Sequence, residues 1–270
     1  MAAIVENPEC FEEYKNHRRQ LKEKHRQFDI DRGYSIDRQA VLVWPGGRYS
    51  GFEAFMTTAK SMIPFDDAHL VIKNSLQDAI DFSIPNDIII LSHGEYVLDD
   101  LGDLNTCLTI FGSGEASKTI INLNSGYGFE VIIKGRGSVC NLRNLTLKSK
   151  SGQGGIWIKD GAALEIKDCL LMNLYTAIKI TGQDTVAKLK YSEVQTCHVG
   201  FEIDHEAKLD ATGGLIEDCD IGILAEKNGS NERNPDEPRT GIVLEEMDNY
   251  AAVKIEMVDP KIKIRIDDVC

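Results

Sequence analysis

The amino-acid sequence predicts an all-β solenoid: a right-handed parallel β-helix with coils of about 22 residues, preceded by a helical and short α/β segment. The main observation is a repeat, because similar segments begin at Gly155, Ala177, Gly200 and Gly222, which lie 22, 23 and 22 residues apart. A period of this length without a helical pattern is typical of one coil of a parallel β-helix. The right hand follows the general rule for crossovers between parallel strands.

The second observation is alternation in the first strand of each repeat. Ile156 and Ile158 flank Trp157, and apolar residues flank a polar residue in the same way in the following two repeats. Because successive side chains of a strand point to opposite faces, we expect the apolar residues to point inward and to stack into a ladder. The outward residues of these strands then form one row along the solenoid: Trp157, Lys179, Glu202 and Leu224.

A second alternating strand follows in each repeat. Its inward residues are predicted to be the pairs Leu164–Ile166, Leu189–Tyr191 and Leu209–Ala211. The outward residues between them are Glu165, Lys190 and Asp210, whose charges alternate in sign from coil to coil. Such alternation suits strands that lie about 4.8 Å apart.

One corner of the solenoid is expected to carry small polar residues. Asn173, Thr196 and Asp218 each lie shortly before a coil start, where their side chains suit turn hydrogen bonds. Cys197 and Cys219 also align between repeats. We interpret these two thiols as stacked residues of the solenoid core.

Residues 1–74 are predicted to precede the β-helix proper, which we expect to span residues 75–270. Three elements are expected in the first part: a charged helix from about Asn7 to Phe28, a strand over residues 40–44 and a helix over residues 50–62. The helix over 7–28 has few apolar residues, so it is either a solvated helix docked by a narrow stripe or a partner-binding segment.

The second part begins with a short helix over residues 75–80 and a buried strand over residues 87–91. Near its end, residues 228–239 are polar and contain two prolines, which predicts a loop that leaves the solenoid. The alternating strand over residues 261–266 is expected to cap the stack, because open solenoid ends expose strand edges and core.

The composition disfavours several classes of partner. The chain has 43 acidic and 30 basic residues and a formal net charge of −13, which disfavours binding to nucleic acid and to an anionic membrane surface. No stretch approaches the roughly 20 apolar residues of a transmembrane helix, so we expect a cytoplasmic protein. The seven cysteines include no CxxC pair, which predicts reduced thiols and neither a metal site nor a cofactor.

Several segments together resemble a known family. They are Glu6-Asn7-Pro8, SLQDAIDFSIPNDIIILSHGEYVLDD, LTIFGSG and the coil starts GIWI, AIKI, GFEI and GIL. In this order they are similar to the C-terminal half of the Nessun dorma and Shc SH2-domain-binding protein family, over nearly the whole chain. The helix with NDIIILSHGEY also occurs in other pectate-lyase-like and F-box β-helix proteins, so by itself it indicates only the fold.

The resemblance implies a cytokinesis scaffold. Members of the family associate with centralspindlin, the complex of a kinesin and a GTPase activator at the spindle midzone, and act at the contractile ring, the midbody and germline ring canals. The Nessun dorma branch is also associated with binding to β-galactoside glycans. No short site motif of the family can be matched in this sequence, so the resemblance assigns no binding residue here.

The fold also occurs in polysaccharide lyases and hydrolases, so catalysis needs a separate test. Those enzymes need acidic ligands for Ca²⁺ with a basic proton acceptor, or two carboxylates on one face. The outward row holds a single carboxylate, Glu202, and no HExxH motif occurs. We therefore expect neither a catalytic nor a metal site. Two alternatives remain, a carbohydrate-active β-helix enzyme and the substrate-binding β-helix of a ubiquitin-ligase adaptor.

The candidate binding residues are Trp157, Lys179 and Glu202. An outward Trp can stack on a sugar or anchor a protein partner, and the two charged neighbours can bind hydroxyl groups. The alternative is that the N-terminal helix or a loop covers Trp157. If Trp157 is an exposed anchor, removal of its indole should weaken binding and barely change stability. If the ring is packed under another element, removal should lower stability and leave the affinity unaltered.

Overall fold

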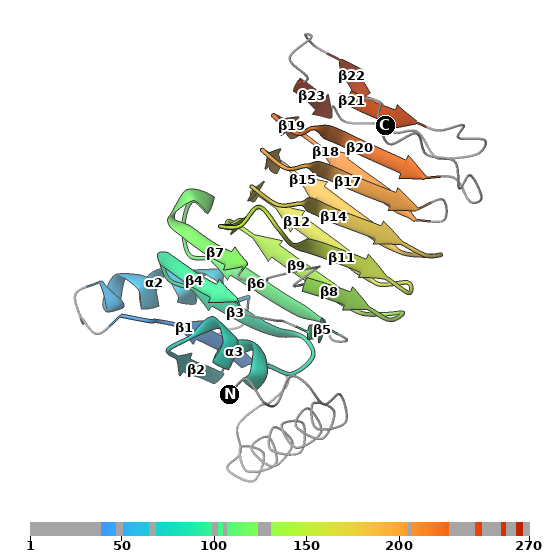
Figure 1. Cartoon of the computed structure of the whole chain (residues 1–270). Coiled ribbons are helices and arrows are strands. Elements are labelled where there is room, and N and C mark those ends of the chain that lie inside the picture. Colours follow the sequence, from blue (N-terminus) through green and yellow to red (C-terminus); the bar gives the residue numbers. More distant parts are fainter. Residues whose placement is uncertain are drawn as a thin grey trace, which may run out of the picture.

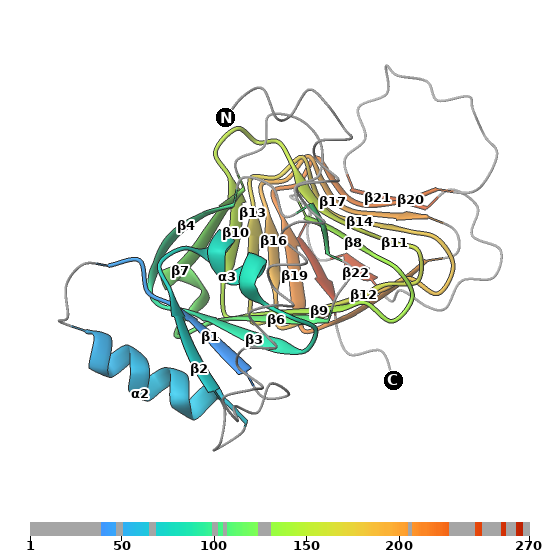
Figure 2. The same cartoon turned by 90° about the horizontal axis from the view of Figure 1, so that it is seen from below.

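A computed structural model describes residues 39–46, 51–64, 69–98, 102–104, 107–123, 131–204, 207–226, 241–244, 255–257 and 263–266. Three mainly parallel sheets form the sides of a triangular solenoid, whose coils stack along one axis (Figure 1). The view along that axis shows the three sides around one core (Figure 2). The predicted right-handed parallel β-helix is confirmed.

The three sheets are named A, B and C after their order in each coil. In spatial order, sheet A contains β18 (Lys208–Thr212), β15 (Val186–Lys190), β12 (Ala163–Lys167), β9 (Val139–Arg143), β6 (Leu108–Gly112), β3 (Asp87–Leu91), β1 (Gln39–Val43) and β2 (His69–Lys73). Sheet B contains β22 (Ile255–Met257), β23 (Lys263–Ile266), β19 (Gly214–Glu217), β16 (Glu193–Gln195), β13 (Leu170–Met172), β10 (Thr146–Ser149), β7 (Thr119–Leu123) and β4 (Gly94–Leu98). Sheet C contains β21 (Gly241–Leu244), β20 (Ile221–Glu226), β17 (Val199–Asp204), β14 (Thr176–Thr181), β11 (Gly155–Lys159), β8 (Val131–Lys134) and β5 (Gly102–Leu104).

From β3 to β20 the chain visits the sheets in strict rotation, so each coil contributes one strand to each sheet. The expected inward ladder on sheet C is present. Ile156 lies in register with Ile178, which pairs in turn with Phe201. All three side chains are completely buried. Stacking of apolar residues from coil to coil therefore builds one continuous core through the solenoid.

The prediction for the second strand was wrong in its middle coil. Leu164 lies in register with Ala187, and Ile166 with Leu189, so the inward pair is Ala187 and Leu189. Tyr191 instead sits in the following turn with a φ of 51° and is 61% exposed. The sequence misled because a small alanine fills an inward position while a larger apolar residue occupies a turn.

The corner between sheets B and C confirms the expected stack of small polar residues. Asn173, Thr196 and Asp218 all adopt left-handed backbone conformations, with φ of 53°, 51° and 53°. Their backbones link adjacent coils, since the Asn173 N–H donates to Gln195 O at 3.2 Å. Position 200, a coil start, requires glycine because the backbone of the next coil approaches it closely. A Cβ there would lie 2.5 Å from the Gly222 carbonyl oxygen.

The described part of residues 1–74 continues the solenoid. β1 pairs with β3 in parallel, and β2, which the sequence did not predict, extends the sheet by one more strand. Helix α2 (Phe52–Met62) lies beside these strands (Figure 2), and its Phe55 and Ala59 are buried against the outer face of sheet A. The boundary that we drew at residue 74 therefore interrupts neither the sheet nor the core, which runs from Val41 to Ile223.

Several other predicted elements are present. Helix α3 (Leu76–Phe82) begins after Ser75, whose hydroxyl accepts a hydrogen bond from the Asp78 N–H at 3.0 Å. A short 3-10 helix that the sequence did not predict, η3 (Ala116–Lys118), precedes β7. The predicted strand over 261–266 is β23, which pairs antiparallel with β19 beyond the last parallel coil. The predicted helix over 7–28 and loop over 228–239 lie outside the described residues.

Candidate functional site

The three candidate residues lie side by side on the outer face of sheet C. Trp157 on β11 is in register with Lys179 on β14, and Lys179 with Glu202 on β17. The row continues with Leu224 on β20, as the repeat predicts. Neighbouring strands lie about 4.8 Å apart, so the indole, the ammonium group and the carboxylate come from backbone positions within about 10 Å of one another.

The indole of Trp157 is held by its neighbours. Its ring N–H donates a hydrogen bond to Thr181 Oγ1 at 2.8 Å. The ammonium group of Lys159 lies 4.1 Å from the ring centroid, and that of Lys179 lies 5.9 Å from it. The side chain is half-buried, so it is a fixed ring with one face against a cation rather than a freely exposed anchor.

The two charged members of the row neutralise each other. Lys179 Nζ lies 2.6 Å from Glu202 Oε1, and the two side chains are 27% and 20% exposed. A charge-assisted hydrogen bond of this length fixes both side chains beside the indole. The arrangement offers a rigid aromatic ring next to a donor and an acceptor, which suits binding of hydroxyl groups or of a protein surface.

The described side chains on this face do not form a pair of catalytic carboxylates. Glu202 is the one carboxylate among the outward side chains of β8, β11, β14, β17 and β20 that the structure describes, and it is bound to Lys179. In the described parts of the chain, no group of three His, Cys, Asp or Glu side chains is placed to hold a metal ion.

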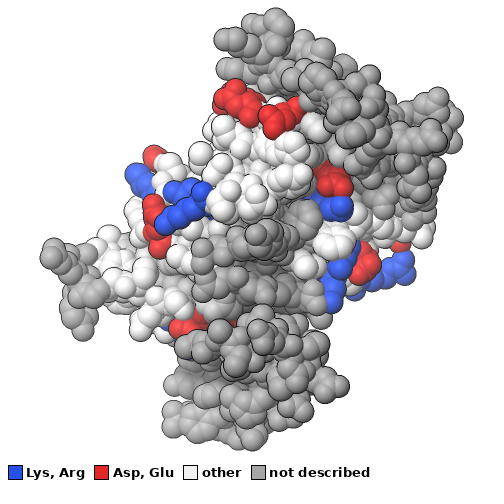
Figure 3. Space-filling model, in the orientation of Figure 1, with Lys and Arg blue, Asp and Glu red and all other residues white. Residues whose placement is uncertain are grey.

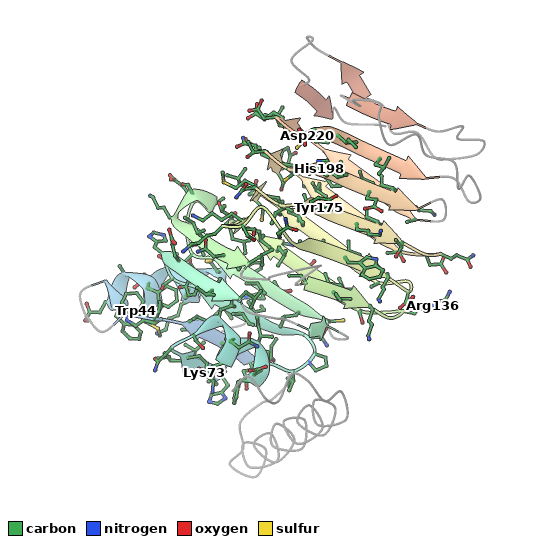
Figure 4. All side chains as sticks on the ribbon, viewed as in Figure 1. Trp44, Lys73, Arg136, Tyr175, His198 and Asp220 are labelled. Carbon is green, nitrogen blue, oxygen red and sulfur yellow. The ribbon has the colours of Figure 1, made fainter. Side chains whose placement is uncertain are left out.

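A second row, which the sequence reasoning missed, lies at the corner between sheets B and C. The Tyr175 and His198 rings are 4.8 Å apart, and His198 Nδ1 lies 2.8 Å from Asp220 Oδ2. The three side chains come from consecutive coils and follow one another along the stack (Figure 4). In the sequence, each of these three residues lies two residues after one of the polar corner residues. This constant offset is the sequence signal from which the row can be found.

The described cysteines are free thiols, as predicted, and four of the five are buried. Burial raises the pKa of Cys140 to about 12 and that of Cys169 also to about 12. A hydrogen bond with the Cys219 thiol, together with burial, raises the pKa of Cys197. Because the thiolate is the reactive form, burial and the raised pKa values disfavour attack by these three thiols as nucleophiles at neutral pH.

Charges on the visible side of the molecule are mixed. Figure 3 shows Lys and Arg next to Asp and Glu in small groups on the described surface, with uncharged areas between them. Ion pairs such as that between Lys179 and Glu202 contribute to this mixing of charges. Among the described helices, none is long and apolar enough to cross a membrane.

Comparison with known proteins gives one informative relative. No family model and no solved structure matches the chain. Protein nessun dorma of Drosophila melanogaster is 24% identical over 223 residues, which cover 69% of this chain and 36% of that protein. The chain thus spans about a third of the length of this relative. The match supports a distant relationship to the Nessun dorma family.

Proposed function

We propose that the chain is a non-catalytic scaffold module that acts with centralspindlin in cytokinesis. The observation that carries the proposal is the distant relationship to the Nessun dorma protein, which extends over 69% of the chain. The resemblance of the coil starts and of the NDIIILSHGEY segment points the same way. The proposed places of action are the contractile ring, the midbody, the spindle midzone and ring canals.

The solenoid architecture suits a scaffold. Successive coils present their outward side chains in straight rows, so a partner can contact several coils at once without any change in the core. The row of Trp157, Lys179 and Glu202 is the proposed contact, because it combines a fixed aromatic ring with a paired donor and acceptor. The same features suit a β-galactoside glycan, which is the proposed second ligand.

The absence of catalysis is part of the proposal. Glycoside hydrolysis uses two carboxylates on opposite sides of the scissile bond, and a lyase uses a metal-bound acid with a basic proton acceptor. Glu202 has a lysine in ion-pair contact and, among the described outward side chains of sheet C, no second carboxylate beside it. This arrangement favours binding over bond cleavage.

A three-armed experiment tests the proposal. The purified chain is incubated with the kinesin and GTPase-activator subunits of centralspindlin, with a glycan array, and with polyuronide substrates. We expect retention of at least one centralspindlin subunit, signal on β-galactosides, and no product from the polyuronides. A variant with Trp157→Ala serves as the comparison for both binding arms.

The alternatives predict different results. Product formation with turnover would replace the scaffold by a carbohydrate-active enzyme. A ubiquitin-ligase adaptor would retain neither centralspindlin subunit and would instead be recovered with ligase components. Binding of centralspindlin that is the same for the wild-type chain and for Trp157→Ala would leave the scaffold in place but move its contact away from sheet C.

A further inference from the structure

The outer face of sheet A is divided into two halves. At the β1–β3 end it is apolar and covered, because Ile88 and Ile90 pack under Phe55 and Ala59 of α2. From β9 to β18 most of the outward side chains are charged or polar, and no described element covers them. A surface of four adjacent strands is therefore open on the described molecule.

This open half is basic although the protein is acidic. Its outward side chains on β9, β12, β15 and β18 include five cations: Arg143, Lys167, Lys188, Lys190 and Lys208. Only Glu165 and Asp210 oppose them, which leaves an excess of three positive charges on the face of a chain with a net charge of −13. We call these seven residues the basic face.

Three of the five cations are stacked on one another in one row, whereas Lys188 alternates with Glu165 and Asp210 in the row beside it. Lys167 is in register with Arg143 on one side and with Lys190 on the other. Like charges directly opposite on neighbouring strands destabilise a sheet. The fold relieves this repulsion only in part. Glu165 is shared between Arg143 at 3.6 Å and Lys190 at 3.8 Å.

Lys167, at the centre of the stack, has no acidic partner among the described side chains. Isolated lysines are common on protein surfaces and need no explanation. Three cations in consecutive coils with one shared carboxylate are different, because the fold itself leaves their charge uncompensated. From this we propose that the basic face docks a short acidic segment of a protein partner.

The size of the face selects a peptide over larger polyanions. Four strands span about 14 Å along the axis, which an extended segment of roughly four to six residues can cover. Charges farther away than about 8 Å are screened at physiological ionic strength, so such a segment interacts mainly with the basic face. Nucleic acid or a membrane surface would extend beyond it onto acidic surface, such as Glu193 and Glu217 on sheet B.

The test uses the full 270-residue chain and a fluorescent octaglutamate peptide, and does not depend on the proposed role in cytokinesis. Fluorescence anisotropy at about 50 mM salt should show saturable binding that weakens as salt is raised. Octaglutamine should not bind. Lys167→Glu should weaken binding at least tenfold, because it reverses the charge at the centre of the stack. Its melting temperature should stay equal or rise, since the new carboxylate lies between two cations.

The matched control is Lys148→Glu on sheet B, an identical charge reversal on a lysine that lies 3.7 Å from Glu95. It should change the affinity for octaglutamate less than twofold. Should Lys167→Glu fail to fold, Lys190→Gln provides a milder variant with an expected threefold loss. Equal losses for the control and for Lys167→Glu would overturn the proposal. So would tighter binding of an oligothymidylate, or of vesicles with anionic lipid, than of the peptide.

Discussion

The outer faces of sheets C and A share one geometry and use their lysines differently. On sheet C, Lys179 ends 2.6 Å from Glu202, and Lys159 lies 4.1 Å from the Trp157 ring centroid. Both of these cations have a partner on the same or the next strand. The row from Trp157 to Glu202 is therefore internally satisfied, and its features of interest are a fixed ring and a fixed ion pair.

Sheet A shows the opposite arrangement. Lys167 lies between two other cations, and one carboxylate, that of Glu165, serves the whole stack. In a β-helix every outward residue has a neighbour directly above and below, so the choice of residue decides whether charges cancel locally or remain available. The difference teaches that regular stacking alone does not define a binding face. A binding face is defined by whether the stacked charges are paired with one another.

The largest expected effect tests the assignment of inward and outward residues on which the comparison depends. Ile180 is completely buried beside the outward Lys179 and Thr181. Ile180→Asp should lower the free energy of unfolding by about 4 kcal/mol or more, because it buries an unpaired carboxylate. Chemical denaturation measures the change, with the outward Lys208→Asp as control. A denaturation midpoint equal to that of the wild-type chain would mean that the inward face has been misassigned.

The next effect concerns the ring on sheet C. Trp157→Ala should weaken binding of the centralspindlin subunit or of a β-galactoside by about 1–3 kcal/mol, as for an aromatic anchor. It should also cost about 1–2 kcal/mol of stability, because the indole N–H bonds Thr181 and the ring contacts the Lys159 ammonium group. Calorimetric titration and thermal unfolding separate the two quantities. Lost stability with unchanged affinity would assign Trp157 to packing alone.

A smaller effect isolates the hydrogen bond that orients the indole. Thr181→Val keeps the side-chain shape but removes the acceptor of the Trp157 N–H, so it should cost about 1 kcal/mol. Thr212→Val, at an outward position of β18 on sheet A, is the matched control and should change stability by less. If the two variants unfold at the same denaturant concentration, the indole is not held by this bond.

The smallest expected effect compares the same substitution, lysine to glutamate, on the two faces, where it should change the stability in opposite directions. Lys179→Glu places a carboxylate next to Glu202 and should destabilise the protein, whereas Lys167→Glu places one between Arg143 and Lys190 and should stabilise it. Each change is expected to be about 0.2–1 kcal/mol. Both should shrink at about 1 M salt, where screening acts over roughly 3 Å. Changes of equal sign would remove the distinction between the faces.

Much of the fold could be predicted because a solenoid repeats a local pattern. The row from Trp157 to Leu224 lies in the predicted register because every coil start shows the same alternation. The prediction failed where that regularity broke, at Leu189 and Tyr191. There the register is set by the burial of Ala187, which has too little apolar surface to stand out in a sequence.

The candidate site was predicted in part. The neighbours Lys179 and Glu202 follow from the repeat, but the contacts of Trp157 with Thr181 and Lys159 depend on side-chain directions that a repeat does not contain. The row from Tyr175 to Asp220 was missed for a related reason. Its members are chemically different, and only the shared corner brings them together.

The sequence by itself determined the coil length, the inward ladder and the row of outward residues on sheet C. These follow from period and alternation, which are local properties of the chain. Only the tertiary structure decided that β1 and β2 extend sheet A, that α2 covers one half of its outer face, and that Lys167 stacks between two cations on the other half. The physical reason is that burial and charge pairing depend on which coils and helices lie next to one another, and distant segments meet only when the chain has wound into its sheets.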